Sequence, residues 1–195
     1  MALASVTRMI ALLRGVNVGG ITVKSGPLAA TFTDLGFLRV RTVLASGNVA
    51  FDAPDGAASA APAELTPAEL TPAELKGRIE SALERSFGYD AWIVLVPQER
   101  MSRIAAAYPF ARADDTEHPY VVFSSDQTIA SELLDAAQDL TQELESIAAG
   151  DGVLYWRVPR GSTLDSPFAK LLAKPRYKPH VTTRNLRTVE KLAVA

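Results

Sequence analysis

The stretch ALLRGVNVGG, residues 11–20, runs from apolar residues straight into a loop with one arginine, one asparagine and several glycines. Glycine accepts positive φ, so successive N–H groups of such a loop can turn inward toward an anion. The loop has neither GxGxxG spacing nor the GK[ST] ending of a P-loop, and a plain strand-to-helix connection is the alternative. Its candidate ligand-binding residues are Arg14, Asn17, Gly19 and Gly20.

A second segment, ASGN at residues 45–48, offers Ser46 as a nucleophile. GxSxG spacing and a local activating partner are both missing, whereas Gly and Asn are typical of a tight turn, so a turn is favoured. A third segment, KPRYKPHVTTRN at residues 174–185, mixes basic and aromatic residues and ends in threonines that we expect at a helix N-terminus. Such a terminus suits a phosphate or carboxylate, and a capping threonine beside an exposed basic linker is the alternative. The candidates from these two segments are Ser46, Asn48, Thr183, Arg184 and Asn185.

The charge distribution suggests that the three segments act together. Residues 1–33 and 166–189 contain nine basic and no acidic residues, although the net charge of the whole chain is -2. Two acid-free regions that meet in space concentrate anions, whereas apart they are simply solvated surfaces. Our hypothesis is that the three segments converge into one polar pocket for a small anionic ligand. An enzyme acting on such a ligand, or a structural or protein-interaction module, are the alternatives, and the spacing identifies no catalytic residue.

The composition excludes much metal and cofactor chemistry. The chain has no cysteine, which rules out disulfides, thiolate zinc sites and iron–sulfur clusters. Its two histidines, His118 and His180, are far apart and outside any HExxH motif. The run ADDTEH at residues 113–118 lacks EF-hand spacing and is typical of a polar loop. We therefore expect no metal site and no cofactor.

The composition and hydropathy of the chain give expectations for its cellular location and its binding partners. The chain has 195 residues, 48% of them hydrophobic and 22% charged, which is enough for a sizeable core. No apolar run approaches the ~18–20 residues of a membrane span, and MALASVT lacks the features of a signal peptide, so we expect a cytoplasmic protein without a membrane partner. The expected central strands carry only Phe51 for base stacking, which disfavours sequence-specific nucleic-acid binding. The oligomeric state is not indicated.

Apolar periodicity and turn residues predict the order strand, helix, strand, strand, helix, strand in the first half. TPAEL occurs twice, at residues 66–70 and 71–75, and each copy is a helix-start signature ahead of the second helix. This order is that of a ferredoxin-like α/β plait. The expected elements are strands at 8–13, 40–45, 48–52 and 91–97, and helices at 25–36 and 72–87.

The second half is predicted to be another α+β unit packed on the first. We expect domains at residues 1–97 and 98–195 and an α+β fold with two plait-like halves. The elements expected in the second half are helices at 98–107, 126–148, 166–174 and from 183 onward, with strands at 120–124 and 152–159.

The motifs ALLRGVNVGG, LGFLRVRTVLASGNVAF and VTTRNLRTVEKL together resemble the bacterial domain-of-unknown-function family DUF1697 over essentially the whole chain. The resemblance implies two ferredoxin-like plaits and no established activity. The sequence departs from the family pattern at Leu186, where tryptophan is usual, at Arg187, and in the stretch VKSGPL. The matching positions are Arg14, Gly15, Asn17, Gly19, Gly20, Ser46, Gly47, Asn48, Thr183, Arg184 and Asn185.

Overall fold

The structure, a computed structural model, divides into two compact units. The first unit comprises Met1–Glu99 together with Val194–Ala195, and the second comprises Arg100–Ala193. The assignment of 1–97 and 98–195 as separate domains stays a prediction. None of the described helices is long and apolar enough to cross a membrane. The structure describes residues 6–16, 22–44, 47–54, 71–111, 116–138, 140 and 145–195.

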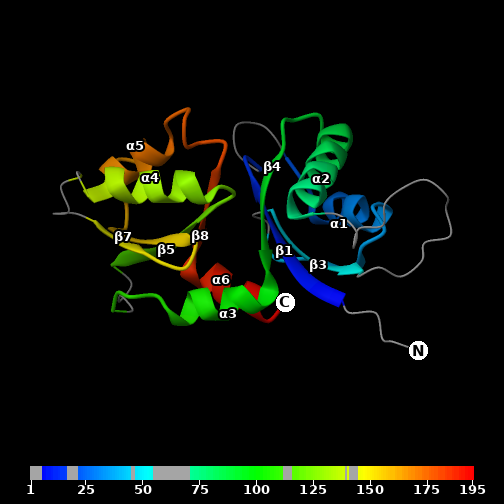
Figure 1. Cartoon of the computed structure of the whole chain (residues 1–195), viewed down its shortest axis with the longest axis horizontal. Coiled ribbons are helices and arrows are strands. Elements are labelled where there is room, and N and C mark those ends of the chain that lie inside the picture. Colours follow the sequence, from blue (N-terminus) through cyan, green and yellow to red (C-terminus); the bar gives the residue numbers. More distant parts are fainter. Residues whose placement is uncertain are drawn as a thin grey trace. The chain divides into compact units, whose positions relative to one another are not determined.

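The first unit is a four-stranded antiparallel sheet with two helices on one face, which confirms the predicted plait (Figure 1). The strand order is β2-β3-β1-β4, so β1 and β3 are central. The alternate residues Met9, Ala11 and Leu13 of β1 belong to the core beneath the helices, as the period of a strand requires. In chain order the elements are β1 (Val6–Arg14), α1 (Ser25–Asp34), β2 (Leu38–Thr42), β3 (Asn48–Pro54), α2 (Pro72–Phe87) and β4 (Trp92–Pro97).

Helix α2 begins at the second copy of TPAEL. Thr71 accepts a hydrogen bond from the N–H of Glu74, whose carboxylate accepts the N–H of Thr71, so both halves of a capping box are present. Gly88 ends the helix with a φ of 68°. The first copy of the repeat, at residues 66–70, lies outside the described residues.

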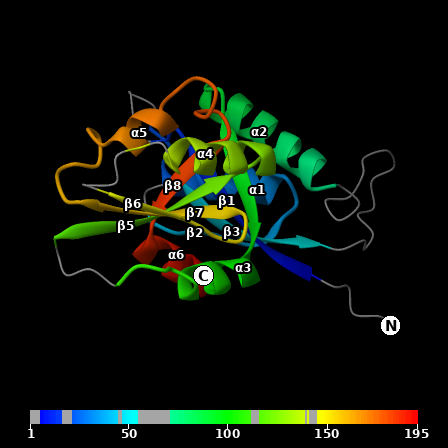
Figure 2. The same ribbon diagram turned by 60° about the vertical axis from the view of Figure 1, so that its left-hand side comes forward.

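The second unit repeats the arrangement and adds a second helical layer. Its strand order is β6-β7-β5-β8, all antiparallel. Helices α4 and α5 cover one face of the sheet, and α3 and α6 lie on the other (Figures 1 and 2). Both halves are therefore plait-like. The elements are α3 (Gln98–Ala106), β5 (Glu117–Ser124), α4 (Gln127–Gln138), β6 (Ser146–Ala149), β7 (Val153–Pro159), α5 (Pro167–Leu172), β8 (Val181–Asn185) and α6 (Leu186–Ala193).

The helix predicted over 126–148 is too long. It ends at Gln138, and β6 follows as a strand of the hairpin with β7. The hairpin turn is the GDG of residues 150–152, in which Gly152 has a φ of 68°. A Cβ added at Gly150 would lie 2.6 Å from the ring of Tyr155, so glycine is required there. The alanine-rich sequence concealed this strand because alanine favours helix.

The helix predicted from residue 183 begins later. The TTRN segment is part of β8, where its β-branched residues fit a strand. Helix α6 starts at Leu186, and its cap is Asn185, whose Oδ1 accepts the N–H of Arg187 at 3.0 Å. The threonines therefore pair within a sheet and do not cap the helix.

One buried carboxylate fixes the outer strand of the first sheet. The Asp52 side chain on β3 is only 3% exposed and pairs with Arg8 at 3.0 Å and with Arg39. Arg8 also donates to the carbonyl of Arg39 at 2.8 Å, across an irregularity in the pairing of β2 where Arg39 has a φ of 45°. Desolvation raises the pKa of Asp52, but the hydrogen bonds and charges of Arg39 and Arg8 outweigh it and hold the pKa below its ordinary value.

Asp52→Asn is expected to lower the free energy of unfolding at pH 7 by about 1.5–3 kcal/mol, because hydrogen bonds to a charged group are lost. Since the folded-state pKa lies below the unfolded value of about 3.9, this contribution is complete above that pH and disappears as the pH falls through the folded pKa. Urea unfolding at pH 7 and pH 3 measures both effects. Asp34→Asn, at an exposed carboxylate on α1, is the control. If Asp52→Asn lowered the free energy of unfolding equally at both pH values, Asp52 would not be the paired, charged carboxylate described here.

Candidate functional site

Two of the three predicted segments meet in the first unit. Because β1 and β3 pair antiparallel with Leu12 opposite Asn48, the end of β1 lies beside the start of β3. The N–H of Leu13 donates to the carbonyl of Gly47 at 2.8 Å. Gly47 has a φ of 65°, and a Cβ added there would overlap Cγ2 of Val16 and lie 3.0 Å from Cβ of Leu13. Gly47 of the SGN segment therefore packs directly on Leu13 and on Val16, just after β1.

Asn48 closes the predicted hairpin. Its side chain is fully buried, and Nδ2 donates to the carbonyl of Val43 at 2.9 Å. The N–H of Val43 in turn donates to the carbonyl of Asn48 at 2.9 Å. This arrangement supports the turn that the sequence favoured, and it gives Asn48 a role in shaping the site. Ser46 lies outside the described residues.

Arg14 ends β1 on the sheet face opposite α1 and α2. It lies across from Trp92, the first residue of β4, and its Cζ is 5.9 Å from the indole centroid, within cation–π range. Within the described residues no carboxylate lies at ion-pair distance from Arg14. Burial lowers the pKa of Arg14 from its ordinary value. The following residue, Gly15, has a φ of 74°, so the chain leaves the strand in a conformation that favours glycine.

Arg184 is on β8 of the second unit. It lies opposite Val121, and because the neighbouring Val122 packs in the core with α4 and α5, Arg184 is on the sheet face away from those two helices. Nη1 donates to Oγ1 of Thr182 at 2.6 Å and to the carbonyl of Thr183 at 2.9 Å. Burial lowers the pKa of Arg184 to about 10, so the guanidinium is still charged at neutral pH. Thr183 points to the other face of the sheet, because it is adjacent in the strand.

The predicted meeting of all three segments stays a prediction, because Arg14 belongs to the first unit and Arg184 to the second. Asn17, Gly19 and Gly20 lie outside the described residues. A hollow of about 180 Å³ between α1 and α2 contains none of the candidate residues. Its lining consists of Thr31, Asp34, Leu35, Ala82, Arg85 and Ser86.

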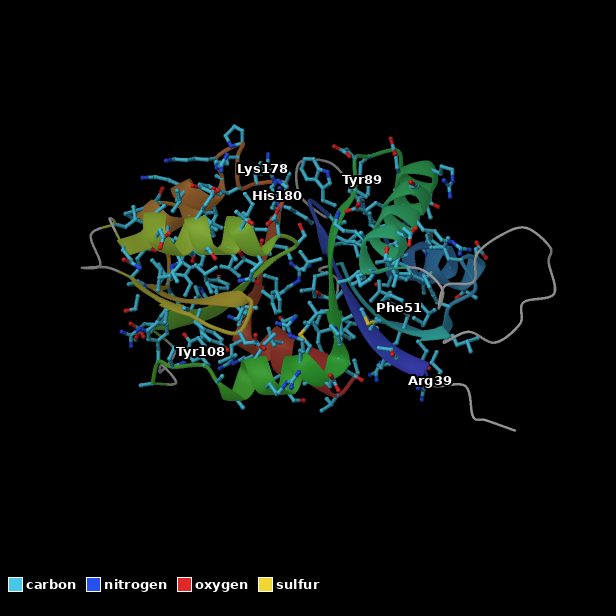
Figure 3. All side chains as sticks on the ribbon, in the orientation of Figure 1. Arg39, Phe51, Tyr89, Tyr108, Lys178 and His180 are labelled. Carbon is cyan, nitrogen blue, oxygen red and sulfur yellow. The ribbon has the colours of Figure 1, made fainter. Side chains whose placement is uncertain are left out.

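Other residues that the sequence singled out are engaged elsewhere. Lys178 and His180 lie on consecutive turns between α5 and β8 (Figure 3), where the carbonyl of His180 accepts the N–H of Ser125 at 2.8 Å. Arg176 is neutralised by a two-pronged contact with Glu132, at 2.8 and 2.6 Å. His118 lies against Tyr120, with ring centroids 5.6 Å apart. Across the described segments, no three His, Asp or Glu side chains are grouped to hold a metal.

Three polar groups were missed because their burial is a tertiary property. Glu145 is buried, and its carboxylate accepts the indole N–H of Trp156 at 2.7 Å and the N–H of Phe168 at 2.9 Å. The hydroxyls of Tyr89 and Tyr108 (Figure 3) are buried and have no hydrogen-bond partner in the described part of the chain. Desolvation raises the pKa of each tyrosine to about 12.

Fold and motifs define an α+β protein of two plait-like halves, each with a four-stranded antiparallel sheet. The chain belongs to the family described as "Protein of unknown function (DUF1697)", whose model matches residues 6–155. The solved structure of the conserved bacterial protein SP0830 from Streptococcus pneumoniae is similar, with 22% identity and a TM-score of 0.74 over 97% of this chain and 98% of that one. That likeness shows the fold.

A second solved structure, an unknown protein from Galdieria sulphuraria, aligns with 10% identity and a TM-score of 0.24 over 93% of this chain and 98% of that chain. Its TM-score is too low to support a common fold. No curated protein matches the chain.

Gly47→Ala is expected to lower the free energy of unfolding by about 2–4 kcal/mol, because it adds a left-handed backbone penalty and a collision with Val16. Gly36→Ala is the matched control, since Gly36 has a φ of 86° and open space around an added Cβ. The control isolates the backbone penalty of about 1–2 kcal/mol. Chemical denaturation of both variants measures the difference, and equal losses would mean that Gly47 does not pack against the loop.

Proposed function

We propose that the protein binds a small oxyanion, a phosphate or a carboxylate, through the glycine-rich loop after β1, the SGN turn and the TTRN segment. The observation that carries this is Arg14, a half-buried guanidinium over Trp92 with no carboxylate at ion-pair distance among the described residues. The proposed ligand-binding residues are Arg14, Asn17, Gly19, Gly20, Ser46, Asn48, Thr183, Arg184 and Asn185.

The desolvation of Arg14 favours an anion. Burial lowers its pKa, which means that the charged form has lost part of its hydration without full compensation. An incoming anion restores that compensation, and the indole of Trp92 limits the motion of the guanidinium. Gly15 allows the backbone to come close to such a ligand, since it has no side chain and no described atom lies within 4 Å of the place a Cβ would take.

Arg184 has a different environment. Nη1 is already held by Thr182 and by the carbonyl of Thr183, so the guanidinium is fixed in orientation on its own strand. Its charge persists at neutral pH. In the proposed site it contributes positive potential, whereas Arg14 makes the direct contact. No reaction is part of this proposed function.

Arg14→Ala is expected to weaken the binding of inorganic phosphate by about 10-fold to 100-fold, because a charge-assisted hydrogen bond is lost. Titration followed by ¹H–¹⁵N NMR suits the chain, since its two tryptophans give two indole signals and only Trp92 lies against Arg14. Arg41→Ala, at an exposed arginine of β2, is the control for the change in net charge. The same titration with acetate in place of phosphate tests whether the site binds a carboxylate.

Arg184→Gln removes the charge of this side chain and is combined with Arg14→Ala in a double-mutant cycle. A coupling that departs from additivity is the expected result if both arginines serve one anion, whereas strictly additive effects indicate separate roles. Wild-type protein that shows no saturable shifts with either phosphate or acetate would refute the proposed function.

A further inference from the structure

We propose that the hollow between α1 and α2 in the first unit binds a small zwitterion, a free α-amino acid with one ammonium group and one carboxylate. The residues that line the hollow belong to α1, to its C-cap or to α2. None of them is part of the proposed oxyanion site, so this inference does not rest on the proposed function.

Two opposite charges line this hollow without neutralising each other. Asp34 is in the last turn of α1, Arg85 is in the last turn of α2, and both residues are exposed. Among the described residues neither side chain makes an ion pair or a hydrogen bond. In the second unit, by contrast, Arg176 and Glu132 from different elements are in contact at 2.6 Å. The separation of Asp34 and Arg85 leaves a place for a cation beside one and an anion beside the other.

The end of α1 suits the ammonium group of the ligand. The last turn of α1 has no basic residue, and Asp34 adds its charge to the negative end of the helix dipole. A cation beside Asp34 interacts favourably with both. Arg85 suits the carboxylate, because a planar guanidinium can donate two parallel hydrogen bonds to it.

The other lining residues limit the size and polarity of the ligand. The volume of about 180 Å³ is below the roughly 300–1,000 Å³ of sites for drug-sized ligands, so a small amino acid is the appropriate size. The hydroxyl of Ser86 accepts a hydrogen bond from Thr31 at 3.3 Å and keeps its own proton for a carboxylate. Leu35 and Ala82 supply apolar surface for a short aliphatic side chain.

Three related molecules test the proposal in ¹H–¹⁵N NMR titrations of the full chain. L-Alanine carries both charges, propionate lacks the ammonium group, and ethylammonium lacks the carboxylate. The amide signals of Leu35 and Ser86 are expected to shift saturably with L-alanine in the millimolar range, because both protein charges are exposed to solvent. Propionate and ethylammonium are each expected to bind about 2-fold to 5-fold more weakly, because each lacks one of the two ion pairs.

Variants of the two charged residues assign the contacts. Asp34→Asn is expected to abolish the advantage of L-alanine over propionate, because the ammonium group has lost its partner. Arg85→Gln is expected to abolish the advantage of L-alanine over ethylammonium for the corresponding reason. The matched controls are Glu84→Gln and Arg41→Gln, at exposed residues of α2 and β2 that do not line the hollow, and both should keep the two advantages.

The outcomes separate this inference from the proposed function. Equal binding of all three molecules to the wild type, or no saturable shift of the Leu35 and Ser86 amides with L-alanine, would overturn the inference. Advantages that persist in both Asp34→Asn and Arg85→Gln would overturn it as well. The indole signal of Trp92 reports on the proposed oxyanion site, so a failure at the hollow leaves the proposed function standing.

Discussion

The antiparallel pairing of β1 with β3 is the constraint on which the first unit depends. It makes β1 a central strand, with β3 on one side and β4 on the other. Once Leu12 faces Asn48, the end of β1 lies beside Gly47, and the second pairing of β1 brings Trp92 opposite Arg14. The end of β1 and Gly47, about thirty residues apart in the chain, thus lie side by side as a consequence of strand pairing. A side chain at Gly47 would disturb this arrangement, because its Cβ would overlap Cγ2 of Val16.

Two arginines on the same face of β1 show how a strand separates structural from binding roles. Arg8 lies opposite Asp52, which neutralises it and also holds Arg39, so its charge stabilises the sheet. Arg14 lies opposite Trp92, which restricts the guanidinium but does not neutralise it. Both positions have the same orientation because they are an even number of residues apart. The difference between them comes from the residue across the pairing: among the described residues, Arg14 has no carboxylate at ion-pair distance, and it lies next to Gly15.

A feature of the fold or of the candidate site could be predicted from the sequence when a few neighbouring residues encode it. Helix α2 was predicted from 72 to 87, as found, because a capping box and a terminal glycine are encoded within a few residues. Strand β6 was missed because SIAA has the composition of a helix, and only its pairing with β7 makes it a strand. Arg14 and Asn48 were identifiable as motif residues. The buried hydroxyl of Tyr89, which has no hydrogen-bond partner among the described residues, was not, because the sequence does not reveal which oxygens are buried.

Within the described residues of the second unit, neutral donors and acceptors help to hold buried charged groups. Glu145 keeps its place by accepting the indole N–H of Trp156 and the first-turn N–H of Phe168 in α5, both of which are neutral donors. The hydrogen bonds that Nη1 of Arg184 donates likewise end on neutral oxygens, those of Thr182 and Thr183. These acceptors orient the guanidinium, and burial lowers its pKa to about 10, which leaves it cationic at neutral pH. Burial of a charged side chain costs desolvation free energy, and hydrogen bonds such as these offset part of that cost.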